Sequence, residues 1–323
     1  MYSDARGVCF CPRCKEAFRE YLAKLHGSPA YRDPVEIVHR QKEFPELHRA
    51  WCAFKCQHYA DFFGDYRREM ERYMAEKGIK APFRFMVYSS YHRSFPGFSE
   101  YKDYRESHSY LRTLEDPAAF NDVFDFLAPM IYTDVYANYG DYDMQLPWRD
   151  THILRQISGD TIPVAPILCA GYPFIYAFGS DNNAEMLKYN MLEALAGGAK
   201  GFGFWGECPF DANDAKSVAE VVAMLAPYED ILLKGMTEAP VQVPSANAIV
   251  RRTALGNRSL LFVSEYSRRE LTIDIECPVM VPSVVRNLAT ERILEHLMPG
   301  QSHFPPRMKN DRVMVLAVEE EGE

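Results

Sequence analysis

The feature that most constrains the fold is an alternation of strand-like and helical segments between residues 82 and 235. Four short segments are nearly continuously apolar, and the stretches between them carry apolar residues at helical spacing. Apolar strands joined by helices are typical of a parallel sheet that is covered on both faces. The expected strands are residues 82–91, 125–134, 162–173 and 201–207.

The helical segments also show where the chain folds back on the strands. Before the first strand, Phe18, Leu22 and Leu25 indicate a helix that Gly27 closes. A long helix is expected over residues 45–78, with one apolar stripe. That stripe is formed by Leu47, Trp51, Phe54, Phe62, Tyr66, Met70 and Tyr73. Further helices are expected over residues 116–124, 147–158, 184–196 and 212–234.

The pattern changes after Pro240. Short alternating segments are separated there by turn residues such as Gly256-Asn257, which predicts an antiparallel β-sandwich. We therefore expect an α/β protein with two parts. Residues 1–238 form a (β/α) barrel portion with a cysteine loop and a long helix, and residues 239–323 form a C-terminal β-sandwich. Four strands are too few to close an eight-stranded barrel, so we expect a partial (β/α)8 barrel that lacks its first strands.

Charge and hydropathy exclude two kinds of partner. The formal net charge is -9 and there is no run of Lys and Arg, whereas nucleic-acid binding needs a concentrated basic face. No apolar run approaches the roughly 20 residues of a membrane-spanning helix. We expect neither a nucleic-acid partner nor a membrane partner.

The expected functional site lies where the strands end, since barrels of this type place functional side chains at the C-terminal ends of their strands. Carboxylates and aromatic rings gather there, and this combination suits sugars, because rings stack on pyranose faces and carboxylates transfer protons. The candidate catalytic residues are Asp4, Asp134 and Glu207. The candidate substrate-binding residues are Tyr88, Tyr91, His92, Tyr132, Tyr172 and Trp205.

Structural alternatives stand beside these assignments. The strand-end aromatic side chains would equally close the barrel core, and His92 would equally be a loop residue without a role. Asp211, another acid near a strand end, precedes a helix and suits an N-cap.

The cysteines suggest a metal site. Cys9, Cys11 and Cys14 form a C-x-C-x-x-C run just ahead of a helix, and three thiolates so close together readily ligate Zn²⁺. A structural zinc ion would require a fourth ligand. The alternative is three unligated cysteines.

The cysteine run, followed by KEAFREYL at residues 15–22, resembles the β-galactosidase family of glycoside hydrolases with a (β/α)8 barrel and a trimer-forming middle domain. In that family an Asn-Glu pair ends the fourth strand, and a C-x-C-x-x-C loop and an A-F-R-x-W-L helix start follow. Here Ser3-Asp4 stands where Asn-Glu is expected, and Tyr21 replaces the Trp. The resemblance implies that Asp4 is the acid/base. The segments DFLAPMIYTD and GAKGFGFWGE look like the sixth and eighth strands of related barrel glycosidases.

The chain departs from the family at two functional positions. The family takes its fourth zinc-ligating Cys from an upstream loop that this chain does not contain, so Cys52 or Cys56 would replace it only if the long helix passes nearby. The family's nucleophile is a Glu at the end of the seventh strand, but residues 162–173 hold no acid. Glu207 or Asp134 would then be the partner carboxylate.

These observations predict a glycoside hydrolase, or the C-terminal portion of one. The alternatives are a non-catalytic carbohydrate-binding or assembly protein on a degenerate barrel, and a different barrel enzyme such as a lyase. The expected partners are a carbohydrate and either further copies of the chain or a missing N-terminal half, because half a barrel exposes strand edges and apolar surface.

Overall fold

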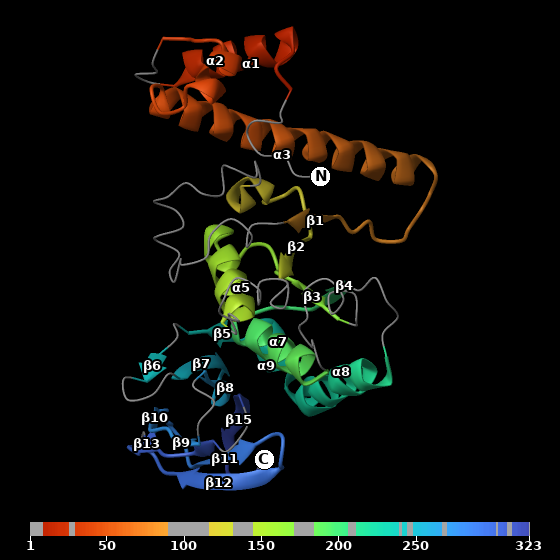
Figure 1. Ribbon diagram of the computed structural model, residues 1–323. Coiled ribbons are helices and arrows are strands. Elements are labelled where there is room, and N and C mark those ends of the chain that lie inside the picture. Colours follow the sequence, from red (N-terminus) through yellow and green to blue (C-terminus); the bar gives the residue numbers. More distant parts are fainter. Residues whose placement is uncertain are drawn as a thin grey trace. The chain divides into compact units, whose positions relative to one another are not determined.

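The computed structural model describes residues 9–25, 30–89, 116–131, 145–170, 184–205, 211–238, 241–243, 248–266, 270–301, 303–308 and 312–322 (Figure 1). The chain divides into two compact units. The first comprises Met1–Met130 and Ile153–Pro163, and the second comprises Ile131–His152 and Val164–Glu323. No helix among the described residues is both long enough and apolar enough to span a membrane.

The first unit begins with three helices, and each of them starts at a proline. They are α1 (Pro12–Lys24), α2 (Pro34–His39) and α3 (Pro45–Glu76). Proline suits the first helical position because its fixed φ matches the helix, and because the N–H that it lacks would have no partner within the helix. The three helices share an apolar core, which consists of Phe18, Leu22, Ile37, Val38, Leu47, Trp51 and Phe54. The expected long helix is therefore confirmed.

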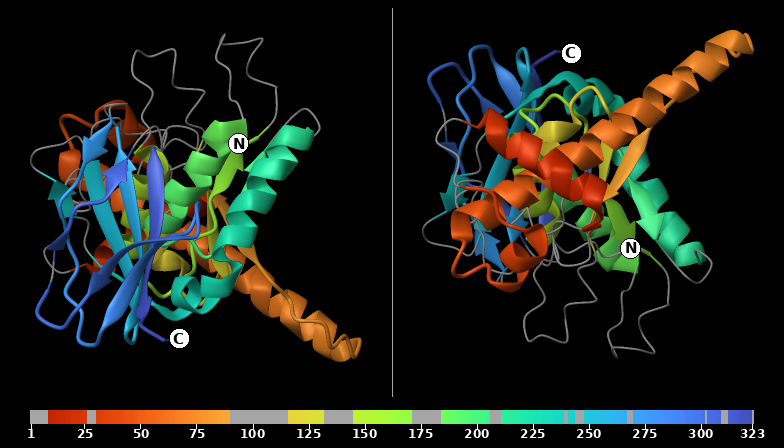
Figure 2. Two further views of the ribbon diagram at one scale, coloured as in Figure 1. Left: turned by 90° about the horizontal axis from the view of Figure 1, so that it is seen from below. Right: turned by 90° about the horizontal axis from the view of Figure 1, so that it is seen from above.

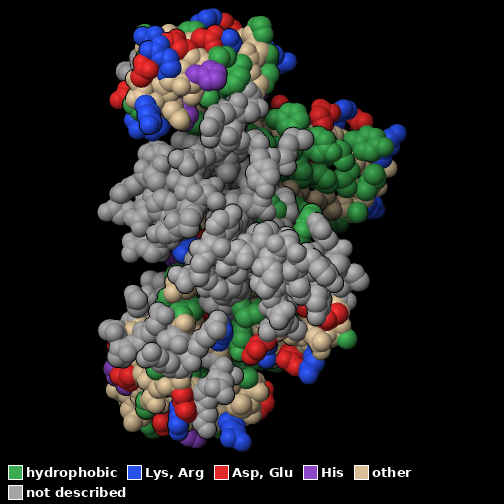
Figure 3. All heavy atoms as spheres, in the orientation of Figure 1, with side chains coloured by type: hydrophobic (Ala, Val, Ile, Leu, Met, Phe, Trp, Pro, Cys, Tyr) green, Lys and Arg blue, Asp and Glu red, His purple; other side chains and the backbone are tan. Residues whose placement is uncertain are grey.

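The apolar stripe of α3 is buried over only part of its length. Its N-terminal members Leu47, Trp51 and Phe54 are buried against α1 and α2. Towards the C-terminal end, Phe62 is 61% exposed and Tyr66 and Tyr73 are each 48% exposed. Figures 1 and 2 show α3 extending well beyond α1 and α2, and Figure 3 shows apolar side chains gathered over this part of the molecule. Helical periodicity thus identified the stripe. In its second half Tyr66 contacts Phe85, with ring centroids 5.7 Å apart, but remains half exposed.

The first unit contains β1 (Met86–Ser89) and all but the last residue of β2 (Phe126–Ile131). They pair in parallel, from Met86 opposite Phe126 to Ser89 opposite Pro129. Residues 116–124 were expected to be helical, and they contain the short 3₁₀-helix η3 (Pro117–Phe120). The helix ends at Phe120, because Asn121 already has an extended ψ of 136°, and Asp122 follows in the left-handed region with φ 68°.

Hydrogen bonds from Asp125 link the start of β2 to α3. Its carboxylate accepts hydrogen bonds from the Phe85 N–H at 2.7 Å and from Arg67 Nη1 at 3.1 Å. Burial alone would raise the pKa of Asp125, but these bonds hold it below its ordinary value.

Helix α5 (Leu146–Ile157) contributes residues to both units. The second unit continues with β3 (Ile167–Cys169), α7 (Ala184–Ala196), β4 (Gly203–Trp205) and α8 (Ala212–Leu225). Strands β3 and β4 pair in parallel, with Ile167 opposite Gly203 and Cys169 opposite Trp205. After α8 come the 3₁₀-helix η5 (Ala226–Tyr228) and α9 (Glu229–Lys234).

Gly197 directly follows α7, at a point where the chain passes close to α5. A Cβ atom at residue 197 would lie 2.5 Å from the carbonyl oxygen of Trp148, which no side chain tolerates. Glycine therefore permits the close approach of the two helices.

The C-terminal part of the second unit is antiparallel, as expected. Its main sheet has seven strands in the order β12-β11-β15-β8-β7-β5, with β6 also paired to β7. These strands are β5 (Met236–Thr237), β6 (Val241–Val243), β7 (Ala248–Leu255), β8 (Arg258–Glu265), β11 (Ser283–Asn287), β12 (Arg292–Leu297) and β15 (Val313–Glu320). Two small sheets pair β10 (Ile275–Glu276) with β13 (His303–Phe304) and β9 (Leu271–Thr272) with β14 (Arg307–Met308).

Both faces of the main sheet are buried. Along β8, Leu260 and Phe262 pack with residues of α7 and α8, whereas Leu261 and Val263 face the small sheets. This follows from the two-residue period of a strand. The antiparallel sheet and the helices α7 and α8 therefore share one core (Figure 2).

The fold class is thus confirmed in its coarse form. The protein is a mixed α/β chain with parallel half-barrel strands, followed by separate antiparallel sheets. Each of the four segments expected to be a parallel strand contains one, over a shorter range than expected.

Candidate metal centre and strand-end site

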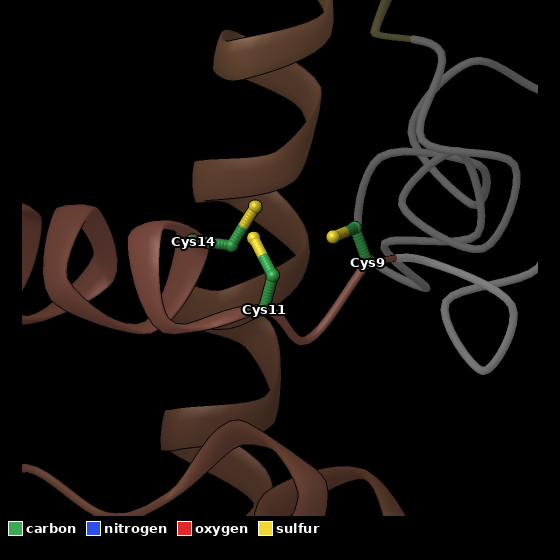
Figure 4. Close-up of side chains that lie close together, drawn as sticks. All are labelled: Cys9, Cys11 and Cys14. Carbon is green, nitrogen blue, oxygen red and sulfur yellow. The ribbon is translucent and has the colours of Figure 1, made fainter.

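Three cysteine sulfurs converge at the start of α1. Cys11 is the N-cap residue of this helix, Pro12 follows it, and Cys14 lies in the first turn. The ligand atoms of Cys9, Cys11 and Cys14 all lie within 4.8 Å of one another. Figure 4 shows the three side chains pointing towards a common space, two from the helix start and one from the preceding loop.

Packing against α3 holds this loop in place. The ring of Phe10, between the first two cysteines, stacks on Trp51 with centroids 5.6 Å apart. Phe18, one turn along α1 from Cys14, meets the same indole edge-on at 5.0 Å. Stacked and edge-on aromatic pairs are both favourable arrangements. The cysteine loop is therefore anchored by ring contacts that do not involve a metal.

The local environment separates the acidities of two of the thiols. The backbone N–H of Cys14 donates a hydrogen bond to Cys11 and, with help from the neighbouring thiols, lowers the pKa of Cys11 to about 7. Burial raises the pKa of Cys14 to about 11. A helix N-terminus favours a thiolate, because the backbone N–H groups and the helix dipole stabilise negative charge there.

The sulfur positions fit one tetrahedral metal ion. Thiolates bound to Zn²⁺ at about 2.3 Å stand about 3.8 Å apart. In this structure the sulfur atoms lie up to 4.8 Å apart. Small rotations of the cysteine side chains would bring them to the spacing that zinc requires. The three cysteines are therefore close enough to ligate a single ion.

Neither cysteine of α3 joins the cluster, although the helix does pass beside it. Cys52 lies with its sulfur 3.8 Å from His48 Nε2, and burial raises its pKa to about 12. Cys56 is buried, and the metal-ligand group found among the described residues contains only Cys9, Cys11 and Cys14.

Helix α3 instead places a lysine beside the cysteine cluster. Lys55 Nζ lies 3.9 Å from Cys14 Sγ, and the side chain is buried. Sequence reasoning missed this residue. The signal that could have found it is its position four residues after Trp51, on the buried face of an amphipathic helix.

Of the expected strand-end residues, Trp205 is the one whose side chain the structure describes. It ends β4 and is 43% exposed. The backbone of Tyr88 lies in β1. The other expected residues, Asp4, Tyr91, His92, Tyr132, Asp134, Tyr172 and Glu207, lie outside the described residues. Their assignment to a sugar site stays a prediction.

Asp211 has the structural role that was its alternative. Its carboxylate accepts hydrogen bonds from the backbone N–H groups of Asn213 at 2.7 Å and Asp214 at 2.8 Å, at the start of α8. The Asp214 carboxylate reaches back to the Asp211 N–H at 3.4 Å, which completes a capping box.

A second charged cluster, which sequence reasoning also missed, is buried between α7 and the main sheet. Arg251 on β7 donates to Glu193 on α7 through Nη1 at 2.6 Å and Nη2 at 3.2 Å. Tyr266 donates to the same carboxylate at 3.1 Å, Ser264 contacts both partners, and the guanidinium lies 5.2 Å from the ring centre of Trp148. Arg251 is 2% exposed and Glu193 is 0% exposed. This buried ion pair therefore has a structural role and joins α7 to the main sheet.

No protein-family model and no curated protein matches this chain. Similar solved structures include α-galactosidase I from Mortierella vinacea, at 10% identity and a TM-score of 0.45, covering 64% of this chain and 56% of that one. An endoxylanase from Clostridium papyrosolvens matches at 11% identity and a TM-score of 0.44, covering 82% of this chain and 71% of that one.

A maltogenic α-amylase from Thermotoga neapolitana matches at 13% identity and a TM-score of 0.41, covering 79% of this chain and 65% of that one. These structural neighbours are glycoside hydrolases. This chain spans 56% of the length of the α-galactosidase. Similarity at this level identifies neither a substrate nor a mechanism, because one fold hosts many functions.

Proposed function

We propose that this chain is a glycoside hydrolase, or the C-terminal portion of one. The observation that carries the proposal is the position of Trp205, an exposed indole at the C-terminal end of a parallel strand, with Glu207 two residues further along the sequence. Parallel-strand ends are where barrel enzymes hold their substrates. An indole face beside a carboxylate suits a pyranose.

In this proposal, residues 1–238 form the barrel portion and residues 239–323 the sheet domain that supports it. Asp4 is the acid/base, and Glu207 or Asp134 is the partner carboxylate. Tyr88, Tyr91, His92, Tyr132, Tyr172 and Trp205 line the sugar subsites.

The test is release of 4-nitrophenol from a panel of aryl glycosides. Asp4→Asn should lower kcat by at least 100-fold, on the order expected for loss of a proton-transfer group. Either Glu207→Gln or Asp134→Asn should do the same, which identifies the partner carboxylate. The matched control is Glu220→Gln on α8, whose carboxylate is exposed and pairs with Lys188. Unchanged rates in all three active-site variants would rule out these assignments.

One observation favours a second candidate, a non-catalytic carbohydrate-binding or assembly protein. Residues 162–170, which lead into and include β3, contain no carboxylate, although this is where the resembling family carries its nucleophile. Calorimetry that measures sugar binding without turnover would support this candidate over the enzyme.

We further propose that Cys9, Cys11 and Cys14 hold a structural Zn²⁺ ion. Their mutual distances fit a tetrahedral ion, and the chemistry of a three-thiolate set favours zinc among the abundant divalent metals. Bound there, zinc would link the loop to α1. Elemental analysis of protein purified without chelators should give about one zinc per chain, and Cys11→Ser with Cys14→Ser should abolish it.

A further inference from the structure

Lys55 is a basic side chain buried beside three thiols. It is 7% exposed, and its ammonium group donates to Cys14 Sγ at 3.9 Å. The same group lies 5.6 Å from the ring centre of Trp51 and 5.9 Å from that of Phe54. Among the described residues, the contacts of this ammonium group are thus one thiol and two aromatic rings.

A buried ammonium group is costly unless an opposite charge compensates it. The two aromatic rings offer only partial compensation, and a neutral thiol offers little. A metal–thiolate centre offers much more. Three thiolates around a divalent cation leave one net negative charge, directly beside the lysine.

We propose that Lys55 is the charge-compensating residue of a metal–thiolate centre at Cys9, Cys11 and Cys14. This inference rests on the proposed metal site. Lys55 acts through Cys14: its N–H groups hydrogen-bond the bound thiolate, and its charge neutralises the centre. Residues that hydrogen-bond to metal ligands orient those ligands and thereby influence metal affinity. Because Lys55 belongs to α3 and the cysteines to α1 and its loop, metal binding then stabilises the contact between the two helices.

The experiment uses the full chain, reduced and freed of metal. Co²⁺ is added first, because thiolate-to-cobalt absorption reports how many sulfurs bind, and Zn²⁺ affinity is then measured by competition with a chromophoric chelator. The variants are Lys55→Met, which keeps the length without the charge, and Lys55→Arg, which keeps the charge. Lys77→Met is the matched control. Lys77 ends the same helix and lies 5.7 Å from the ring centre of Tyr73, but it is exposed and about 33 Å along the helix from Lys55.

Lys55→Met should weaken Zn²⁺ binding by about 10- to 100-fold, whereas Lys55→Arg and Lys77→Met should stay near the wild type. The cobalt absorption per bound ion should not change, since the sulfur ligands remain. Thermal unfolding separates this role from a purely structural one. Without metal, Lys55→Met should be as stable as the wild type or more so, because an uncompensated buried charge is gone. Zinc should raise the Tm of Lys55→Met by less than it raises the Tm of the wild type.

Wild-type Zn²⁺ affinity in Lys55→Met would overturn the inference and leave the metal site standing. Equal loss of stability with and without metal would also overturn it, because a packing role acts in both states. Absence of thiolate-to-cobalt absorption in the wild type would refute the metal site itself, and the inference with it. Should Lys55→Met fail to fold, Lys55→Gln provides the same comparison.

Discussion

Two regions of the molecule each bury a basic side chain, and they differ in what faces it. Arg251, between α7 and the main sheet, meets the Glu193 carboxylate through two hydrogen bonds and a nearby indole. Lys55, between α1 and α3, meets a thiol and two rings. The first charge is compensated by the protein's own residues. The second lies beside a cysteine cluster that would carry a net negative charge with a divalent metal ion bound.

The comparison predicts its largest effect at Arg251. Arg251→Met should lower the free energy of unfolding by about 3–5 kcal/mol, because Glu193 would stay buried without its partner. Urea unfolding at pH 7 measures this. The double variant Arg251→Met with Glu193→Leu should cost much less than the sum of the two single changes, since both charges are then removed. Additive costs would show that the pair is not coupled.

Metal removal is expected to have the next largest effect, and in the first region alone. A ligand at 100 times its Kd stabilises a folded protein by about 2.7 kcal/mol. Chelation should therefore raise amide hydrogen exchange in α1 and the N-terminal half of α3. Exchange in β8 and β15 should not change, because these strands belong to the second unit and Cys9, Cys11 and Cys14 to the first. Equal acceleration in both regions would contradict the proposed location of the metal.

Two helix caps offer a smaller and symmetrical test. Asp33 accepts a hydrogen bond from the Val35 N–H at 2.9 Å in the first unit, and Asp211 caps α8 in the second. Replacing either aspartate by Ala should cost about 1 kcal/mol, measured by thermal unfolding. The control is Asp65→Ala on the exposed side of α3, where an i,i+3 ion pair with Arg68 contributes little.

The smallest effect concerns reactivity and leaves stability unchanged. In metal-free protein at pH 7 to 8, a Cys11 thiol with pKa about 7 is half or more ionised, whereas a Cys14 thiol with pKa about 11 stays protonated. Iodoacetamide should therefore label Cys11 before Cys14, as measured by peptide mass spectrometry. Raising the pH towards 11 should narrow the difference. Zinc should protect both residues, and equal labelling at pH 7 would contradict the described environment.

Much of the fold was predictable from local patterns. Strand segments such as residues 201–207 and helices such as residues 184–196 were recognisable because periodicity reports which face of an element is buried. The helical stretch at residues 116–124 was also recognisable, but its 3₁₀ form and its early end at Phe120 were not, because no pattern marks the extended backbone of Asn121. For the candidate metal site, the spacing of Cys9, Cys11 and Cys14 was sufficient to predict that their sulfur atoms lie together. Residues close in sequence around a helix start are also close in space.

The sequence by itself determined the order of strands and helices, the change to antiparallel strands near Pro240, and the cysteine cluster. Only the tertiary structure decided that Lys55 faces Cys14, 41 residues away, and that Arg251 meets Glu193, 58 residues away. It also decided that half of the α3 stripe stays exposed. The physical reason is that periodicity encodes the geometry within one element. Which distant side chains meet depends on how separate elements pack, and that depends on the whole chain.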